Sequence, residues 1–310
     1  MELSIYQSRD VKAHADKVWF ERDTVLEKKH DKDISILLDF IRKLFKHKGA
    51  VIGAAIILVF ILTAVFAPWL TSYDYESPDI NAMLQAPSWE HPFGTDEFGR
   101  DILTRIIYGS RISLKVSLIA VAVSLVIGTV LGALAGYYGG VVDYIITSIT
   151  DIAWSFPTTL LAIAFIAALG PGLQNVIIAI ALASWSGYCR VVRGEVLSLR
   201  QREFIEAARI LGMSDSRIIF KHILPNALTP VVVMATLELP KAIVIEASLS
   251  FLGLGAQPPL PSWGVILDSG KGLIGQAPWV SFFPGLMIML VVLGFNLFGD
   301  ALRDVLDPKS

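Results

Sequence analysis

Apolar and polar residues in this chain are sorted into long blocks rather than short alternating patterns. Six apolar runs each approach the roughly twenty residues that an α-helix needs to cross about 30 Å of hydrocarbon. They lie at about residues 49–70, 112–137, 149–169, 173–190, 226–250 and 281–301. The strands of a membrane barrel would instead alternate over about ten residues, so that architecture is excluded. The pattern predicts an all-α membrane protein with six transmembrane helices.

The residues before the first apolar run fall into two parts. Residues 1–32 are charged and lack apolar periodicity, which indicates a cytosolic tail. In residues 33–48, apolar side chains recur at helical spacing and basic ones follow, which predicts an amphipathic helix on the membrane surface. A cleaved signal peptide would place a shorter apolar core nearer the start, so the first run is expected to remain as a span. We therefore divide the chain into a cytosolic part at 1–48, a first transmembrane helix at 49–70, an extracytoplasmic segment at 71–111, a core at 112–302 and a cytosolic tail at 303–310.

Charged residues make up only 17% of the chain, against about a quarter in a soluble domain, and their positions set the expected orientation. Lysine and arginine are retained on the cytosolic side of a membrane protein. They gather before the first span and between the fourth and fifth spans, which places both regions and both termini in the cytosol. The extracytoplasmic segment is less clear, because it holds Arg100, Arg105 and Arg111.

Ionisable residues also lie within the fifth expected span. Glu238 and Lys241 are three positions apart, so they can pair on one helix face, and Glu246 follows them. An ionisable side chain at membrane depth is by default a functional candidate that faces a bundle interior or water. The alternatives are a pair that is merely tolerated, or a position nearer the outer surface.

Small residues form a stripe along the second span. Gly128, Gly132, Gly136 and Gly140 recur every four residues. Small side chains on one helix face let a neighbouring helix approach closely, so we interpret the stripe as a packing surface. A lining for a transport path is the second interpretation. Pro157, in the third span, is expected to kink that helix.

Two turn-rich or proline-rich segments lie on the expected outer side. Residues 91–101 are polar and rich in turn formers, and residues 257–264 read Gln-Pro-Pro-Leu-Pro-Ser-Trp-Gly. Each segment can form an exposed docking face for an external partner. Each can equally form a cap that closes the helix bundle.

The chain lacks the sequence motifs of common catalytic sites. Gly270-Lys271-Gly272 has neither the preceding glycine nor the following Ser or Thr of a phosphate-binding loop. The five histidines are scattered without metal-ligand spacing, and Cys189, the only cysteine, cannot form an internal disulfide. We expect a non-enzymatic chain that binds no metal or other cofactor itself, and nothing in the sequence points to nucleic acid.

The segment between the fourth and fifth spans, at 191–225, is too long and too regular for a simple connection. Helix formers precede Gly212, which suits the left-handed residue that ends a helix. Ser214 suits the N-cap of a second helix, with Asp215 in its first turn. Pro225 is expected to separate this helix from the fifth span. A rigid helix–turn–helix of this kind can transmit force from a moving partner.

This segment resembles the signature loop of the membrane subunits of ABC importers, through Glu206-Ala207-Ala208, Gly212 and Leu224-Pro225, although His222 replaces a usual isoleucine. Further motifs resemble the dipeptide, oligopeptide and nickel branch of that family, and within it the C-type subunit of the dipeptide permeases. They are Lys221-His222-Ile223-Leu224-Pro225-Asn226, Gly94-Thr95-Asp96, Phe98-Gly99-Arg100-Asp101, Ala247-Ser248-Leu249-Ser250-Phe251-Leu252-Gly253-Leu254-Gly255, Gln257-Pro258-Pro259 and Asn296-Leu297-Phe298-Gly299-Asp300-Ala301-Leu302-Arg303-Asp304. The resemblance covers roughly residues 40–308.

The resemblance implies a type I ABC importer permease fold in the plasma membrane of a bacterium or archaeon. The chain would pair with a second, homologous permease subunit in the lipid, and an external solute-binding protein would deliver the substrate. Two cytosolic ABC ATPases would use ATP and Mg²⁺. The loop that seats in an ATPase groove would include Glu203, Glu206, Ala207, Ala208, Gly212, Met213, Ser214, Asp215 and Pro225. The implied substrates are di- or oligopeptides, with nickel and glutathione as alternatives.

Functions of another class remain open at this point. An intramembrane enzyme would rely on Asp151, Glu238 and Glu246, without a paired motif to support it. A self-sufficient carrier or channel would transport without an ATPase. Such a carrier would be expected to have inverted repeats, which we do not detect in the sequence.

Overall fold

The structure is a computed structural model that describes residues 39–306. Its helices are α2 (Lys48–Leu70), α3 (Ile102–Tyr138), α4 (Gly140–Trp154), α5 (Thr158–Leu169), α6 (Leu173–Arg200), α7 (Glu203–Ile210), α8 (Asp215–Ile218), α9 (Leu224–Phe251), α10 (Trp263–Gly270) and α11 (Trp279–Leu306), with a 3₁₀ helix η1 (Ile80–Ala82) and a π-helical turn η2 (Ile219–Ile223). Residues 39–46 are also helical. The first part of the amphipathic helix expected at 33–48 lies outside the described residues.

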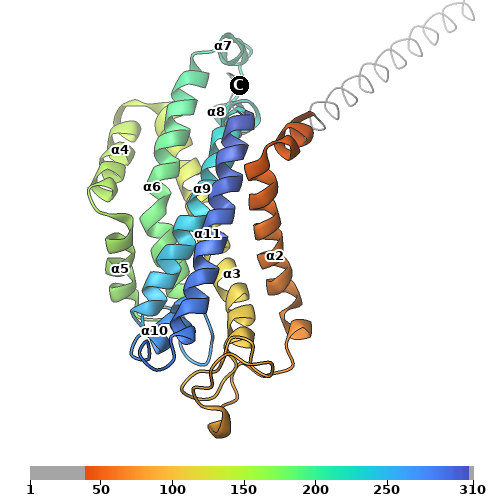
Figure 1. The fold of residues 1–310 in the computed structure, drawn as a ribbon. Helices are drawn as coiled ribbons and strands as arrows, with labels where there is room; N and C mark the ends of the chain where they lie inside the picture. The colour runs from red at the N-terminus through yellow and green to blue at the C-terminus, as the bar shows by residue number, and fades with distance from the viewer. Residues whose placement is uncertain (1–38, 307–310) are drawn as a thin grey trace, which may run out of the picture.

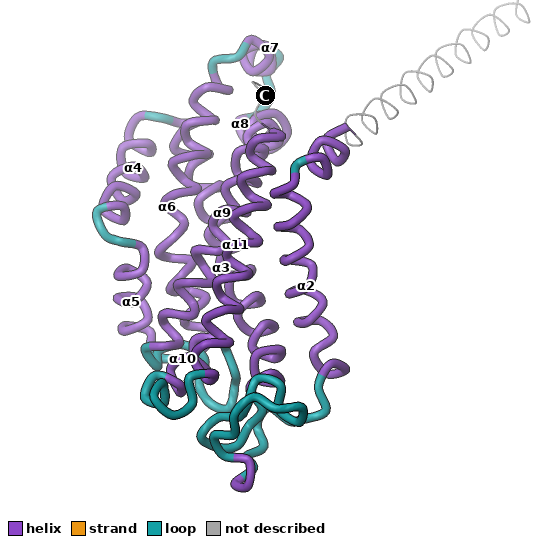
Figure 2. The backbone as a smooth tube through the Cα atoms, viewed as in Figure 1, coloured by secondary structure: helices purple, strands orange, loops and turns teal. Residues whose placement is uncertain are grey.

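In the described part of the chain, five helical segments are long and apolar enough to cross a membrane: α2, α3, α6, the continuous segment Asp215–Phe251 and α11. α4 and α5 pass the same test together, although they bend by 96° at the break between them. Figures 1 and 2 show these helices as one bundle. The predicted all-α fold with six spans is confirmed, with the bent pair as the third span.

The third span differs from the single kinked helix that the sequence predicts. α4 begins at Gly140, well before the expected start at 149, and ends at Trp154. Pro157 stands at the N-cap of α5 with a ψ of 131°. A proline lacks the N–H that a helix interior needs and disfavours helical geometry in the residue before it, so α4 ends there. The two halves of the broken span meet about halfway along the bundle (Figure 1).

The two ends of the bundle carry the segments that the sequence assigns to opposite sides of the membrane. α7 and α8 lie at the same end as the start of α2 and the end of α11, whereas α10 and residues 71–101 lie at the other end (Figure 1). α3 begins at Ile102, inside the segment expected to be extracytoplasmic. Asp101 caps it by accepting a 2.7 Å hydrogen bond from the Thr104 N–H.

α3 packs along α6 through three glycines of the predicted stripe. A β-carbon on Gly128 would overlap the Trp185 carbonyl, and β-carbons on Gly132 and Gly136 would crowd the α6 backbone in the same way. Gly140 is different: it follows the end of α3, has a φ of +54° and has no atom within 4 Å of its ideal Cβ position. Gly140 therefore serves the turn into α4 and does not belong to the packing surface.

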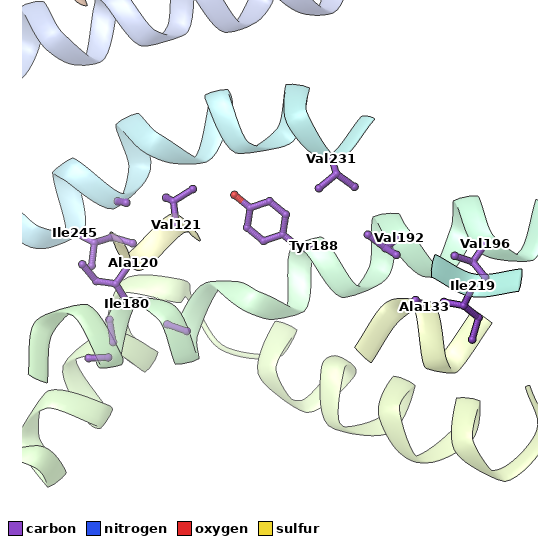
Figure 3. Packing of buried hydrophobic residues seen from close by; sticks show 14 of the residues in the cluster. Ala120, Val121, Ala133, Ile180, Tyr188, Val192, Val196, Ile219, Val231 and Ile245 are labelled. Carbon is purple, nitrogen blue, oxygen red and sulfur yellow. The ribbon is translucent and has the colours of Figure 1, made fainter. Parts of the chain in front are cut away.

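The largest buried apolar cluster joins α3, α6 and α9. Figure 3 shows Ala120 and Val121 of α3, Ile180 and Tyr188 of α6 and Ile245 of α9 within it. None of these five side chains is more than 6% exposed. Because lipid tails are as apolar as these side chains, close packing rather than removal from water holds the helices together.

The outer segment before α3 is folded around one buried carboxylate. Asp96 is 0% exposed and accepts hydrogen bonds from the backbone N–H groups of Phe98 and Arg100. It also accepts a 2.8 Å bond from the Arg100 guanidinium, and Arg105 Nε lies 3.6 Å from the same carboxylate. Arg100 and Arg105, which weaken the expected excess of basic residues on the cytosolic side, are therefore ion-pair partners of a carboxylate within this segment.

Both outer segments pack onto the bundle. Trp279 Nε1, at the start of α11, donates a 3.0 Å hydrogen bond to the Thr95 carbonyl. Trp263 is fully buried, and its indole N–H donates to the Ile106 carbonyl of α3 at 3.1 Å. These contacts make both segments caps on this end of the bundle, although Trp89, within residues 71–101, remains fully exposed.

Candidate functional site

Residues 201–218 form a compact projection at one end of the bundle, which we name the α7–α8 knob (Figure 1). α7 ends in a Schellman motif. The Met213 N–H donates to the Ala208 carbonyl at 3.1 Å, and the Gly212 N–H donates to the Arg209 carbonyl at 2.9 Å. Gly212 has a φ of +72°, the left-handed conformation that its place in the sequence predicts.

Tyr137, near the end of α3, fixes the knob to the bundle. Its hydroxyl donates a 2.6 Å hydrogen bond to the Asp215 carboxylate in α8. The Arg209 guanidinium lies over its ring, 5.3 Å from the centroid, and the Arg200 guanidinium donates to its backbone carbonyl at 2.8 Å. Together with the buried Ile205 side chain, these contacts hold α7 and α8 against the ends of α3 and α6.

Most of the candidate coupling residues lie on the outer surface of the knob. The exposed ones are Glu203, Glu206, Ala207, Gly212, Ser214, Asp215 and, further on, Pro225, whereas Met213 is half-buried and Ala208 is buried. Phe204, Ile210 and Leu211 are also exposed, by 46%, 81% and 76%. Sequence reasoning missed these three, because an apolar residue is expected to be buried unless a partner covers it. Ser214 has N-cap backbone geometry but makes no capping hydrogen bond.

Pro225 does not separate α8 from the fifth span, which corrects the sequence expectation. The helix runs without interruption from Asp215 through the π-helical turn η2 into α9. Pro225 stands in the first turn of α9, directly after this π-helical turn, and the side-chain amide of Asn226 donates to the His222 carbonyl at 2.6 Å. The knob is therefore continuous with the helix that crosses the membrane.

A cavity of about 640 Å³ opens on the face of the bundle where α4 breaks from α5. Its lining comprises Ala153, Trp154, Phe156, Pro157, Thr158, Thr159, Ala183, Ser184, Ser186, Gly187, Met234, Glu238, Lys241, Val244 and Ile245. The backbone of residues 155–157 is not helical there. Such backbone at membrane depth is tolerated only where protein or water covers it. This face is therefore not one that lipid covers.

Glu238 and Lys241 line this cavity close to the midpoint of α9. Lys241 Nζ donates to Glu238 Oε1 at 2.6 Å, in the i, i+3 pairing that the sequence allows. The Lys241 side chain is 65% exposed and the Glu238 side chain 16%, so the carboxylate lies deeper than the ammonium group. Removal of either partner would leave one charge alone at membrane depth, which is costly.

Glu246 lies on the same helix but does not line the cavity. It is 0% exposed, and its two carboxylate oxygens accept 2.8 Å hydrogen bonds from the hydroxyls of Ser113 and Ser250. Ser113 belongs to α3, so the carboxylate of Glu246 ties α9 to α3 inside the bundle. The structure thus brings Glu238 and Lys241 together and places Glu246 in a different environment.

The carboxylates on which an intramembrane enzyme would rely have separate partners. Asp151 of α4 pairs with Arg190 of α6 at 2.7 Å, Glu238 pairs with Lys241, and Glu246 is held by serines. Within residues 39–306, no group of three or more His, Cys, Asp or Glu side chains is placed to hold a metal ion.

Comparison with known proteins identifies related families and relatives. Residues 128–310 match the family described as "Binding-protein-dependent transport system inner membrane component", and residues 35–87 match the N-terminal transmembrane domain of oligopeptide transport permease C. The chain is 55% identical to the dipeptide transport system permease protein DppC of Alkalihalophilus pseudofirmus over 268 residues, which cover 86% of this chain and 88% of that protein. It is 46% identical to the glutathione transport system permease protein GsiD of Shigella dysenteriae over 272 residues, or 87% and 90% of the two chains.

A solved structure is similar in fold. A chain of the MetNI methionine ABC transporter in an inward-facing conformation matches with a TM-score of 0.53 and 22% identity, over 66% of this chain and 97% of the matched one. At that identity the match speaks for the fold alone, which is the type I ABC importer permease fold. The family match and the 55% identical relative go further: this chain belongs to the inner membrane components of binding-protein-dependent transport systems, as an ABC importer permease similar to the C-type subunits of the dipeptide and oligopeptide branch.

Proposed function

We propose that this protein is the membrane-spanning, non-catalytic subunit of an importer for di- or oligopeptides. The family match supports the transport role, and the 55% identical relative is named as a dipeptide permease. The observation that carries the proposal is the α7–α8 knob, an exposed projection anchored by Tyr137 and continuous with a membrane-spanning helix. Separate ATPase subunits would bind and use ATP and Mg²⁺.

The surface of the knob supports docking to a cytosolic ATPase. Glu203 and Glu206 offer negative charge, and Ile210 and Leu211 offer apolar area. A groove with an apolar floor and a basic rim would accept both, and the small Ala207 and Gly212 would let its walls approach the backbone. Because α8 continues into α9, a displacement of the knob would be carried to the helix that lines the cavity. This docking puts the knob and both chain termini in the cytosol.

The cavity face supports a second permease subunit. Lys241 and the open backbone at residues 155–157 need water or protein beside them rather than lipid. We propose that a homologous permease covers this face and that two ATPases bind the pair. An external solute-binding protein would dock at the outer caps, where Trp89 is fully exposed. The complex would lie in the inner, or plasma, membrane.

Glutathione is the second candidate substrate, because the relatives named as glutathione permeases are 46% identical over 87% of this chain. Glutathione is itself a small peptide with charged ends, so the same cavity chemistry would suit both. Nickel is the other alternative substrate in this branch of the family, and the transport assay includes it.

The test is an ATPase and uptake assay on the complex, in which the chain is co-expressed with its neighbouring genes and purified in lipid. The cognate binding protein is added with peptides of graded length, with glutathione, or with nickel. Hydrolysis and uptake stimulated by short peptides are the expected result. Stimulation by nickel alone would overturn the substrate, and the absence of any co-purifying ATPase from a folded chain would overturn the docking role of the knob.

A further inference from the structure

The cavity beside the α4–α5 break has a mixed lining. Its volume of about 640 Å³ lies in the range of sites that hold a small ligand, about 300–1,000 Å³. The hydroxyl-bearing residues Thr158, Thr159 and Ser184 line it together with the aromatic Trp154 and Phe156. Such a combination suits a ligand that has both polar and apolar parts.

The two charges of the cavity lie near the midpoint of a helix that is long and apolar enough to cross a membrane. Glu238 and Lys241 lie near the midpoint of α9, and their side chains are 16% and 65% exposed. A charge at this depth is expensive, so such residues usually face a water-filled path or a protein interior. The exposed ammonium of Lys241 therefore indicates that the cavity is wet or covered by protein, and that its charges are available to a ligand.

We propose that Glu238 and Lys241 form a subsite for the charged ends of a zwitterionic peptide, with Lys241 for the carboxylate and Glu238 for the ammonium group. This inference rests on the proposed function and deepens it. Without substrate, the two side chains neutralise each other at 2.6 Å. With substrate, each exchanges its partner for the opposite charge of the peptide. Two extended residues span at most about 7 Å, so the ends of a dipeptide lie within reach of one flexible lysine and its neighbour.

Partner exchange of this kind fits transport better than tight binding does. No uncompensated charge is left at membrane depth in the empty or the occupied state, so the peptide enters and leaves without a large change in electrostatic energy. Glu246 provides the contrast: its carboxylate is fully buried, accepts hydrogen bonds from Ser113 and Ser250, and does not line this cavity. A purely structural pair would not need the open space that surrounds Lys241.

The experiment uses the complete complex with its ATPases and binding protein in lipid vesicles, and radiolabelled L-alanyl-L-alanine as the probe. The variants are Lys241→Met, Glu238→Gln, the double variant, and Lys241→Arg, which keeps the charge. Lys271→Met and Asp268→Asn are matched controls. Lys271 and Asp268 form another i, i+3 pair, at 2.5 Å, but they lie around the end of α10, away from this cavity.

We expect thermal stability to fall in each single variant and to recover in the double variant, because no lone charge remains there. Dialanine uptake should fall about tenfold or more in the single variants and stay low in the double variant, since a lost charged hydrogen bond has about that effect on binding. Stimulation of ATP hydrolysis by the loaded binding protein should persist. Lys241→Arg and both control variants should retain uptake.

A double variant that regains uptake together with stability would overturn the subsite and make the pair structural. A parallel loss of ATPase stimulation in the single variants would also overturn it, by assigning the pair to conformational coupling. The wild-type complex provides the third outcome. If another substrate stimulates its ATP hydrolysis and it takes up no dialanine, both the proposed peptide substrate and this subsite are wrong.

Discussion

The Tyr137 hydroxyl donates a 2.6 Å hydrogen bond to the Asp215 carboxylate and so joins the end of α3 to the first turn of α8. α3 runs along α6 through close glycine contacts, and α8 runs on into α9. This bond therefore links the knob to α3, and α3 shares the buried core with α6 and α9. Variants that remove this bond therefore test how a movement of the knob is transmitted to the membrane-spanning helices.

Replacement of Tyr137 by Phe should loosen the knob without unfolding the bundle. The lost hydrogen bond is worth about 1 kcal/mol, because Asp215 is exposed to water. We expect fewer peptides transported per ATP hydrolysed, measured in vesicles that contain the complete complex. Tyr138→Phe is the control, because that neighbouring side chain is 51% exposed. Equal coupling ratios in the two variants would contradict the anchoring role of Tyr137.

Replacement of Gly212 by Ala should distort the turn between α7 and α8. Its φ of +72° costs a residue with a β-carbon about 1–2 kcal/mol. We expect weaker co-purification of the ATPase and uncoupled hydrolysis, with the chain still inserted in the membrane. Gly194→Ala, in α6, is the matched control, because no atom lies within 4 Å of its added β-carbon. Wild-type coupling in Gly212→Ala would remove the docking role of this turn.

Replacement of Gly128 by Ala should push α3 away from α6. The added β-carbon overlaps the Trp185 carbonyl, and overpacking of this kind costs about 1–3 kcal/mol. We expect a lower unfolding temperature in detergent. Gly285→Ala, in α11, provides the comparison, because the nearest atom to its added β-carbon is 3.9 Å away. If both variants unfold at the same temperature, the glycine contacts do not hold this helix pair together.

Replacement of Asp96 by Asn should disrupt the outer segment. The change leaves Arg100 and the fully buried Arg105 without their shared carboxylate, and breaking a buried ion pair costs about 3–5 kcal/mol. We expect faster proteolysis within residues 71–101 and lower thermal stability. Asp74→Asn, at an exposed position of the same segment, should change neither. Protease resistance equal to wild type would show that the segment is held by its other contacts.

The number and order of the spans could be predicted from the sequence because hydrocarbon thickness sets one minimum length for every crossing helix. Their lengths could not, since α3 and α6 continue beyond the apolar runs that predict them. The broken third span could not be predicted in this way. A proline in an apolar run is compatible with both a kink and a break, and the outcome depends on what covers the freed backbone. At Pro225 the error is in the opposite direction. A separation was predicted there, but the helix continues, because the π-helical turn before the proline accommodates it.

The helix–turn–helix of the knob could be predicted in part, because Gly212 and the residues next to it determine the local backbone conformation. The environments of Glu238 and Glu246 could not be told apart by their spacing. They differ because Glu246 meets Ser113, which is 133 positions away in the sequence. The exposure of Phe204, Ile210 and Leu211 also depends on the tertiary arrangement, since their apolar character by itself suggests burial.

The broken span also has a consequence for the life of the protein in the cell. A newly made copy that stands alone in the bilayer exposes the Lys241 ammonium group and the open turn at residues 155–157 to hydrocarbon, which can neither hydrate the one nor bond the other. Such an orphan is a natural target for quality-control proteases of the membrane. If the proposed second permease covers this face, the amount of this chain that accumulates should follow the rate at which that permease is synthesised, and the lifetime of the chain becomes a property of the proposed complex.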